Sequence, residues 1–327
     1  MGTVNDLKQN VSGILYSKIF EIEVCSIRDL EVAYQFFSKD TWIFRGHEKA
    51  SWRLETSLER ELNQERFCRS RFHVPTFTYQ LERRTVDEFR VKAAKIGCGL
   101  TGSYIGDLAI MQHYGAKTRL LDFSWAFDVA LCFAYANPFR NHSRAVWAVR
   151  WEGLFSDDRL FTLEGLCQSV GTSCQQMHIF PSPPSIIPSD DDIVRWGNWA
   201  DSQIVQDLAG TAQPGILPVL LGNSMSQRMK VQRGLFLMPS TLDPFEQNLS
   251  ANLGVEIQEI RSPSKALDFT HLIRMCDGVY PVVIKIVFPV SSERDIRKFL
   301  TGKGLSLATL YPDINGGAMS CSPSMCW

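Results

Sequence analysis

Apolar residues recur along the chain at two spacings, one typical of helices and the other typical of strands. In the segment 26–40 they recur every three or four positions, which predicts a helix with Leu30, Ala33, Tyr34 and Phe37 on one face. Ser292 and its successors resemble a capping box at the start of a late helix. The same reasoning predicts further helices over 79–97, 103–114, 125–136 and 291–304, and strands over 41–44, 118–123, 145–151, 234–240 and 281–289.

The predicted elements fall into three blocks, with a mixed signal between the second and the third. The segment 180–192 is rich in proline and serine, which predicts a loop or linker. The sequence leaves open whether this segment separates domains or is a surface insertion. We expect a single domain over 1–327, with a helical lead-in at 1–40 and an insertion or loop at 152–225.

Composition narrows the function classes without choosing among them. With 34 basic and 35 acidic residues the net charge is −1, so no overall field attracts the chain to nucleic acid or to an anionic membrane. The nine cysteines are scattered and include no C-x-x-C pair, which disfavours zinc and is typical of reduced thiols. Neither an apolar run of about eighteen residues nor a secretory signal pattern is present. We therefore expect a cytoplasmic protein with no membrane partner and no metal.

Chemically useful side chains gather at the ends of two predicted strands. Arg45 and His47 follow the strand at 41–44, while Thr118 and Arg119 open the strand at 118–123. Polar side chains at a strand mouth are where pockets form, so we expect Arg119 to be functional.

Structural roles remain open for several of these residues. Arg45 could form a buried fork with Asp122 or Glu55, a common device for fixing a fold. His47 could cap an element or lie at the surface, and His113 could satisfy the last carbonyl groups of its helix.

Five motifs carry a resemblance to a known family. They are "FRGH" at 44–47, "WRLETSLER" at 52–60, "MQHYGAKTRLLDFS" at 111–124, "VQRGLF" at 231–236 and "LYPDINGGA" at 310–318. With them the chain resembles the FRG domain family, which is named for its Phe-Arg-Gly motif, here at 44–46. The resemblance implies that the single domain expected over 1–327 is of the FRG type.

The order of these elements is similar to that of ADP-ribosyltransferases of the Arg-Ser-Glu branch. This resemblance implies an α+β fold, with a mixed, split sheet and flanking helices, and NAD as the substrate. Arg45 would bind a phosphate or ribose of NAD, Ser124 would build the nicotinamide pocket, and Gln232 would stand where the branch has its glutamate. The further residues expected to contact NAD are His47, His113, Thr118, Arg119 and Phe123.

The chain departs from that branch at Gln232. A glutamine can hydrogen-bond a ribose hydroxyl, but it cannot take up the proton of that hydroxyl. Either another acid supplies this function, with Asp122 and Glu88 as candidates, or the fold has been retained for binding. Asp122 is preferred because it lies two residues before Ser124. We therefore expect Arg45, Asp122 and Gln232 to be the catalytic residues.

The leading functional expectation is mono-ADP-ribosyl transfer from NAD to a protein or nucleic acid. The protein would then act as a toxin or antiviral defence effector, and it would bind an inhibitor or partner protein. Two alternatives stay open. One is a non-catalytic module that binds a nucleotide or nucleic acid. The other is a phosphodiesterase or nuclease that uses His47, His113 and the two arginines on a phosphate. The absence of G-x-G-x-x-G and P-loop motifs argues against Rossmann hydride transfer and P-loop NTPase activity.

Overall fold

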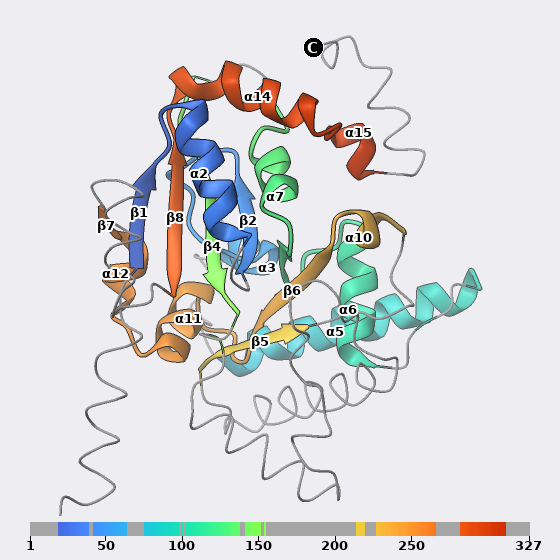
Figure 1. Ribbon diagram of the computed structural model, residues 1–327. Helices are drawn as coiled ribbons and strands as arrows, with labels where there is room; N and C mark the ends of the chain where they lie inside the picture. Colours follow the sequence, from blue (N-terminus) through green and yellow to red (C-terminus); the bar gives the residue numbers. More distant parts are fainter. Residues whose placement is uncertain are drawn as a thin grey trace, which may run out of the picture.

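The computed structural model shows an α+β protein in which helices cover a mixed β-sheet (Figure 1). Within the described part of the chain, no helix has both the length and the apolar character that crossing a bilayer requires. The described residues are 19–38, 42–63, 75–97, 100, 103–137, 141–151, 154, 214–219, 227–265 and 282–311.

The sheet, taken over these residues, has the strand order β5-β6-β3-β2-β4-β8-β1-β7. β1 runs parallel to both of its neighbours, and the other neighbouring strands pair antiparallel. The strands are β1 (Ile19–Glu23), β2 (Trp42–His47), β3 (Leu121–Ser124), β4 (Arg144–Arg150), β5 (Ile216–Val219), β6 (Gly234–Pro239), β7 (Ser264–Lys265) and β8 (Val283–Phe288).

The helices flank this sheet (Figure 1). α2, α7 and α14 contribute to one core cluster, and α11 and α12 to a second. The helices are α2 (Ile27–Phe37), α3 (Ser57–Asn63), α5 (Pro75–Lys95), α6 (Tyr104–His113), α7 (Phe127–Ala134), α10 (Gln227–Val231), α11 (Phe245–Leu253), α12 (Ile257–Arg261), the 3-10 turn η2 (Val290–Ser292), α14 (Glu293–Gly302) and α15 (Leu307–Leu310).

The predicted α2, α5, α6, α7 and α14 and the predicted β2, β3, β4, β6 and β8 are all present, with differences at their ends. β2 continues to His47, so Arg45 lies inside the strand and not beyond its end. The capping box expected at Ser292 is wrong, because the Ser292 hydroxyl donates to the carbonyl of Pro289 and makes no cap hydrogen bond to α14. The loop expected at 180–192 lies outside the described residues.

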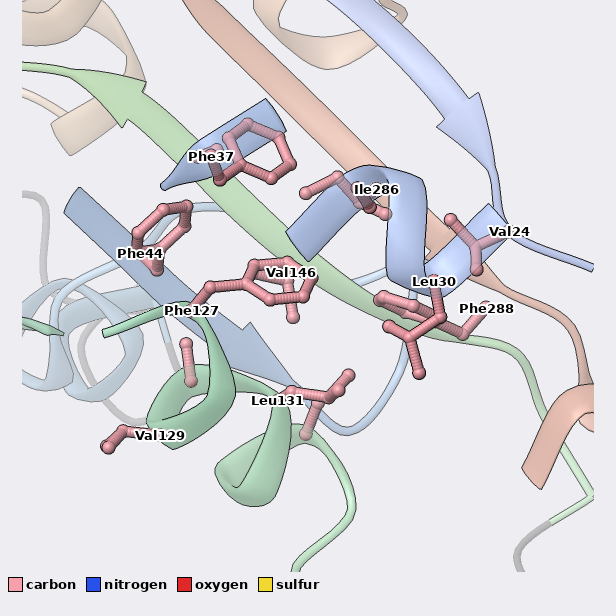
Figure 2. Close-up of a cluster of buried hydrophobic side chains, with 14 of the residues drawn as sticks. Val24, Leu30, Phe37, Phe44, Phe127, Val129, Leu131, Val146, Ile286 and Phe288 are labelled. Carbon is pink, nitrogen blue, oxygen red and sulfur yellow. The ribbon is translucent and has the colours of Figure 1, made fainter. Parts of the chain in front are cut away.

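An apolar cluster lies between the sheet and helices α2, α7 and α14 (Figure 2). Phe37 of α2, Phe44 of β2 and Phe127 of α7 meet there, with ring centroids 5.4 to 5.5 Å apart. Such aromatic pairs each contribute about 0.5–1.5 kcal/mol beyond the area that they bury. Ile43, the neighbour of Phe44 in β2, belongs instead to the cluster under α11. Side chains of β2 therefore alternate between two cores.

Helix α7 packs directly on β2 at Gly46. A Cβ atom built on Gly46 would lie 1.9 Å from the carbonyl oxygen of Ala130 and 2.7 Å from the amide nitrogen of Ala134, both in α7. Because these are backbone atoms, no side-chain rotation can relieve the contact, and glycine is required here. The Phe-Arg-Gly sequence thus has a structural reason. Phe44 fills the core beneath α7, Gly46 admits the helix, and Arg45 projects from the other side of the strand.

The sheet opens between β2 and β3. β2 pairs with β4 along all of its length, and β3 pairs with β6 along all of its length, but β2 and β3 share only the pair Phe44 with Ser124. Beyond this pair no ladder joins the two strands, although both are described over their whole length. The resulting gap in the sheet positions the candidate site.

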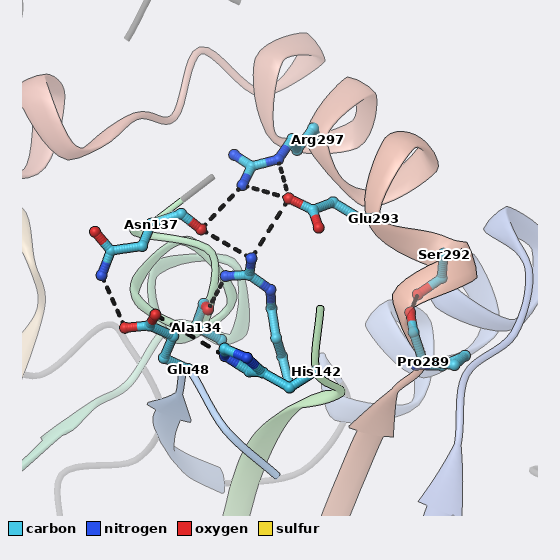
Figure 3. Close-up of polar contacts among 9 residues, drawn as sticks. Glu48, Ala134, Asn137, His142, Pro289, Ser292, Glu293 and Arg297 are labelled. Carbon is cyan, nitrogen blue, oxygen red and sulfur yellow. Dashed lines mark hydrogen bonds and ion pairs between the residues drawn. The ribbon is translucent and has the colours of Figure 1, made fainter. Parts of the chain in front are cut away.

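A buried polar network fixes the C-terminal end of α7 (Figure 3). Arg144 of β4, which is 1% exposed, donates from its guanidinium to the carbonyls of Ala134 and Asn137, both at 2.8 Å. Glu293 of α14 lies 3.4 Å from this guanidinium and 2.6 Å from that of Arg297. The network connects α7 to β4 and α14, so the helix that rests on Gly46 is held at its end as well.

Candidate functional site

A cleft of about 320 Å³ lies at the gap between β2 and β3. This volume is near the lower end of the range of roughly 300–1,000 Å³ that is usual for small-molecule pockets. The sides of the cleft come from α6, α7, α10 and the residue that follows α15. Its main polar and aromatic side chains are Arg45, Trp52, Asp122, Phe133, Arg228 and Tyr311.

Arg45 bridges the gap. Its Nη1 donates to the main-chain carbonyl of Asp122 at 2.8 Å and lies 3.7 Å from the carboxylate of the same residue. Burial lowers the pKa of the Arg45 guanidinium, and the Asp122 carboxylate opposes this effect, so the group keeps its positive charge at neutral pH. Within the described residues its Nη2 has no hydrogen-bond partner, which leaves that nitrogen for a ligand.

His47 restrains the side chain of Arg45 through a hydrogen bond. The imidazole is buried, and its Nε2 accepts a hydrogen bond from Nε of Arg45 at 3.1 Å. Burial, followed by the charge of Arg45, lowers the pKa of His47 well below its usual value, so the ring is neutral. This hydrogen bond places the ring proton on Nδ1. His47 does not line the cleft, and its hydrogen bond restrains the side chain of Arg45.

Arg119 lies in the core and not in the cleft. It is 1% exposed, and its Nε and Nη2 form a fork with the carboxylate of Glu82 in α5, at 2.9 and 2.6 Å. This pairing uses the charge of Arg119 inside the protein, and Arg119 does not line the cleft. Of Arg45, Arg119 and Asp122, only Arg45 and Asp122 line the cleft.

Thr118 is likewise a structural residue. Its hydroxyl donates to Oε1 of Gln112 in α6, and its main-chain amide and carbonyl both bond to the hydroxyl of Ser57 in α3. It is fully buried and does not line the cleft. These contacts join the segment before β3 to two helices.

Ser124 and Gln232 both line the cleft, but internal hydrogen bonds occupy much of their polar capacity. The Ser124 hydroxyl donates to the carbonyl of Gln232 at 2.7 Å and accepts from the amide of Ala126 at 3.0 Å. The side-chain Nε2 of Gln232 donates to the carbonyl of Leu310 at 3.0 Å. Gln232 therefore connects the turn before β6 to the end of α15.

The remaining predicted residues differ in position. His113 and Phe123 line the cleft. Glu88, the alternative acid, lies on α5 with its carboxylate 3.9 Å from Nζ of Lys92 and is not part of the lining. Of the two candidate acids, only Asp122 lines the cleft, and its side chain is 65% exposed.

Sequence reasoning missed one wall of the cleft. The guanidinium of Arg228 in α10 stacks on the ring of Tyr311, 4.0 Å from its centroid, and Phe133 of α7 contacts the same ring edge-on at 6.3 Å. Trp52 and Glu48 complete the set at the end of β2. Two signals pointed to this wall. Tyr311 belongs to the motif at 310–318, and Arg228 lies one helical turn before Gln232.

The described residues include no group of three or more histidine, cysteine and acidic side chains placed to hold a metal ion. The family model of the FRG domain matches residues 40–143, which is less than half of the chain. Comparison with curated proteins and with solved structures finds no match in either set. The matched range contains β2, β3 and the polar segments between them.

Proposed function

We propose, from the premise that the chain contains an FRG domain at residues 40–143, that its cleft binds NAD and transfers ADP-ribose from NAD to a protein or nucleic acid. The observation that carries this proposal is the meeting of Arg45, Asp122 and aromatic side chains at a gap in a mixed sheet. Such a gap suits an ADP-ribosyltransferase-like fold. The activity would serve a cytoplasmic toxin or antiviral defence effector, restrained by an inhibitor or partner protein.

The parts of the cleft match the parts of the substrate. The charged guanidinium of Arg45 suits a phosphate, to which its Nη2 can donate a charge-assisted hydrogen bond. Trp52 and Phe133 offer flat apolar surfaces on which a base or a nicotinamide ring can stack. Because the cleft is small for a dinucleotide, one end of NAD would enter it and the other would lie across its open side.

The transfer begins at the bond between C1′ of the nicotinamide ribose and the ring nitrogen. This bond breaks, and nicotinamide leaves as a neutral molecule with the bonding electron pair. The carboxylate of Asp122 stabilises the positive charge left on the ribose. A nucleophilic atom of the target then bonds to C1′ and releases its proton, for which Asp122 is the acceptor in the cleft.

One observation favours a second function, a binding module without turnover. The hydroxyl of Ser124 and the amide of Gln232, which would contact the nicotinamide riboside in a transferase, are engaged in bonds to the protein itself. A cleft that binds a nucleotide through Arg45 alone needs neither group. The phosphodiesterase alternative has less support, because His47 and Arg119 both lie outside the cleft lining.

The test follows NAD labelled in its adenine ring, incubated with the protein and a cell lysate. Released nicotinamide is measured, and the label is traced through the protein and nucleic-acid fractions. We expect Arg45→Ala to abolish both signals while the protein stays folded by circular dichroism. Arg294→Ala, which removes an exposed arginine from α14, is the matched control and should keep full activity.

The outcomes separate the two functions. Label transfer that depends on Arg45 supports the transferase. If the protein neither releases nicotinamide nor transfers label, the transferase proposal is wrong. Nucleotide binding that depends on Arg45, measured by calorimetry in the absence of turnover, would then establish the binding module.

A further inference from the structure

The stacked pair of Arg228 and Tyr311 has a geometry suited to binding an anion. The guanidinium of Arg228 lies over the ring of Tyr311, with Cζ 4.0 Å from the ring centroid, and this contact restrains the group. Phe133 supports the ring from α7, and Gln232 holds the neighbouring residue, Leu310, by its carbonyl. The ring over which Arg228 lies is thus held in place by its contact with α7 and by the hydrogen bond of Gln232 to the residue before it.

Stacking leaves the hydrogen-bonding edge of Arg228 uncommitted. The N–H groups of a guanidinium point outward in its plane, whereas the contact with Tyr311 uses only its face. Within the described part of the chain, Arg228 donates no hydrogen bond and forms no ion pair, although it is half-buried and lines the cleft. The guanidinium of Arg228 therefore has a positive charge and unused donors with which it can bind a ligand.

The cleft also contains a second arginine, Arg45. Arg45 reaches the cleft from β2, with its Nη2 unpaired among the described residues, while Arg228 reaches it from α10. The two arginines come from different elements and line one cleft, so a ligand with negative charge at two positions can meet both.

We propose that Arg228 forms a second anion subsite and that, with Arg45, it selects ligands that carry a diphosphate. This inference rests on the proposed nucleotide cleft and specifies its substrate class. One phosphate binds Arg45 at the gap in the sheet, and the other binds the edge of Arg228. Tyr311 supplies a positioning contact, because it restrains the guanidinium through which Arg228 donates its hydrogen bonds.

The experiment measures binding and does not depend on turnover. The affinities of the full-length protein for ADP, inorganic pyrophosphate and AMP are determined by calorimetry. Because hydrogen bonds to charged groups are strong, Arg228→Gln should weaken ADP and pyrophosphate about tenfold or more. AMP should lose less, since its single phosphate can stay on Arg45. Arg228→Lys, which keeps the charge but loses the planar fork, should fall between the two.

Two further variants separate binding from structure. Lys230→Gln removes an exposed charge from the same helix, outside the cleft lining, and should leave all three affinities unchanged. Tyr311→Phe keeps the ring and should preserve ADP affinity, whereas Tyr311→Ala should lower it. If Arg228→Gln weakens ADP and AMP by the same factor, Arg228 acts only as a brace for the wall, and the diphosphate subsite is refuted.

The results also distinguish this inference from the transferase proposal. ADP binding that depends on Arg228, in a protein that does not consume NAD, supports the subsite and refutes the transfer. NAD consumption and ADP binding that are both unchanged in Arg228→Gln refute the subsite and leave the transfer standing. If the wild-type protein binds neither ADP nor pyrophosphate at millimolar concentration, the subsite does not exist.

Discussion

Replacing Gly46 by alanine tests the contact on which the architecture of the site depends. The added Cβ would lie 1.9 Å from the carbonyl oxygen of Ala130, whereas real Cβ contacts almost never fall below 3.0 Å. Helix α7 and β2 must therefore separate by at least 1.1 Å, the difference between these two distances. Overpacking usually costs about 1–3 kcal/mol, and here the clash is between backbones, so we expect a cost of about 3 kcal/mol or more.

Thermal unfolding measures this cost. At roughly 2–4 °C per kcal/mol for a large domain, Gly46→Ala should lower the melting temperature by about 6–12 °C. The matched control is Gly302→Ala at the end of α14, where an added Cβ meets nothing within 4 Å. Alanine favours the helix more than glycine does, by up to about 1 kcal/mol, so this control should be neutral or stabilising.

A further readout concerns the cleft. Because Ala130 and Phe133 of α7 line it, a displaced helix should also weaken nucleotide binding in Gly46→Ala. If Gly46→Ala melted within a degree of the wild type, α7 would not rest on β2 as described. The assignment of α7 to the wall of the cleft would then be wrong as well.

Local patterns were sufficient to predict β2, β3, β6, α6 and α7 at the site, but not α10 or α15. The periodicity that predicts α2 is a property of adjacent residues, and the structure buries Leu30, Ala33 and Phe37 of the predicted face. The pattern did not predict β1, which lies in the segment 1–40 that was expected to be a helical lead-in. It also placed the end of β2 too early, since Arg45 and Gly46 do not belong to the apolar residues that mark a strand.

The site was harder to predict because its membership depends on contacts between distant residues. Arg45 and Arg119 looked equivalent, each being an arginine near a predicted strand end. The two arginines differ because Glu82, which lies 37 positions before Arg119 in the sequence, pairs with Arg119 inside the core. The pairing of Arg228 with Tyr311 is likewise tertiary. No local spacing reveals which arginine is neutralised by a partner and which remains available.

Two further substitutions test the electrostatics. Asp122→Asn removes an exposed carboxylate 3.7 Å from Arg45. Calorimetry should therefore show ADP binding up to about fivefold tighter, while nicotinamide release falls about a hundredfold or more. A loss of both ADP binding and nicotinamide release would contradict these roles. Burial, opposed in part by hydrogen bonds, raises the pKa of Glu59 to about 7. Folded Glu59 then retains a proton that the unfolded chain releases, so its contribution to stability is lost as pH rises from about 4.5 to about 7. Urea unfolding should therefore show Glu59→Gln gaining stability relative to wild type at pH 8 over pH 5, by at most about 3 kcal/mol, and an equal difference at both pH values would refute this.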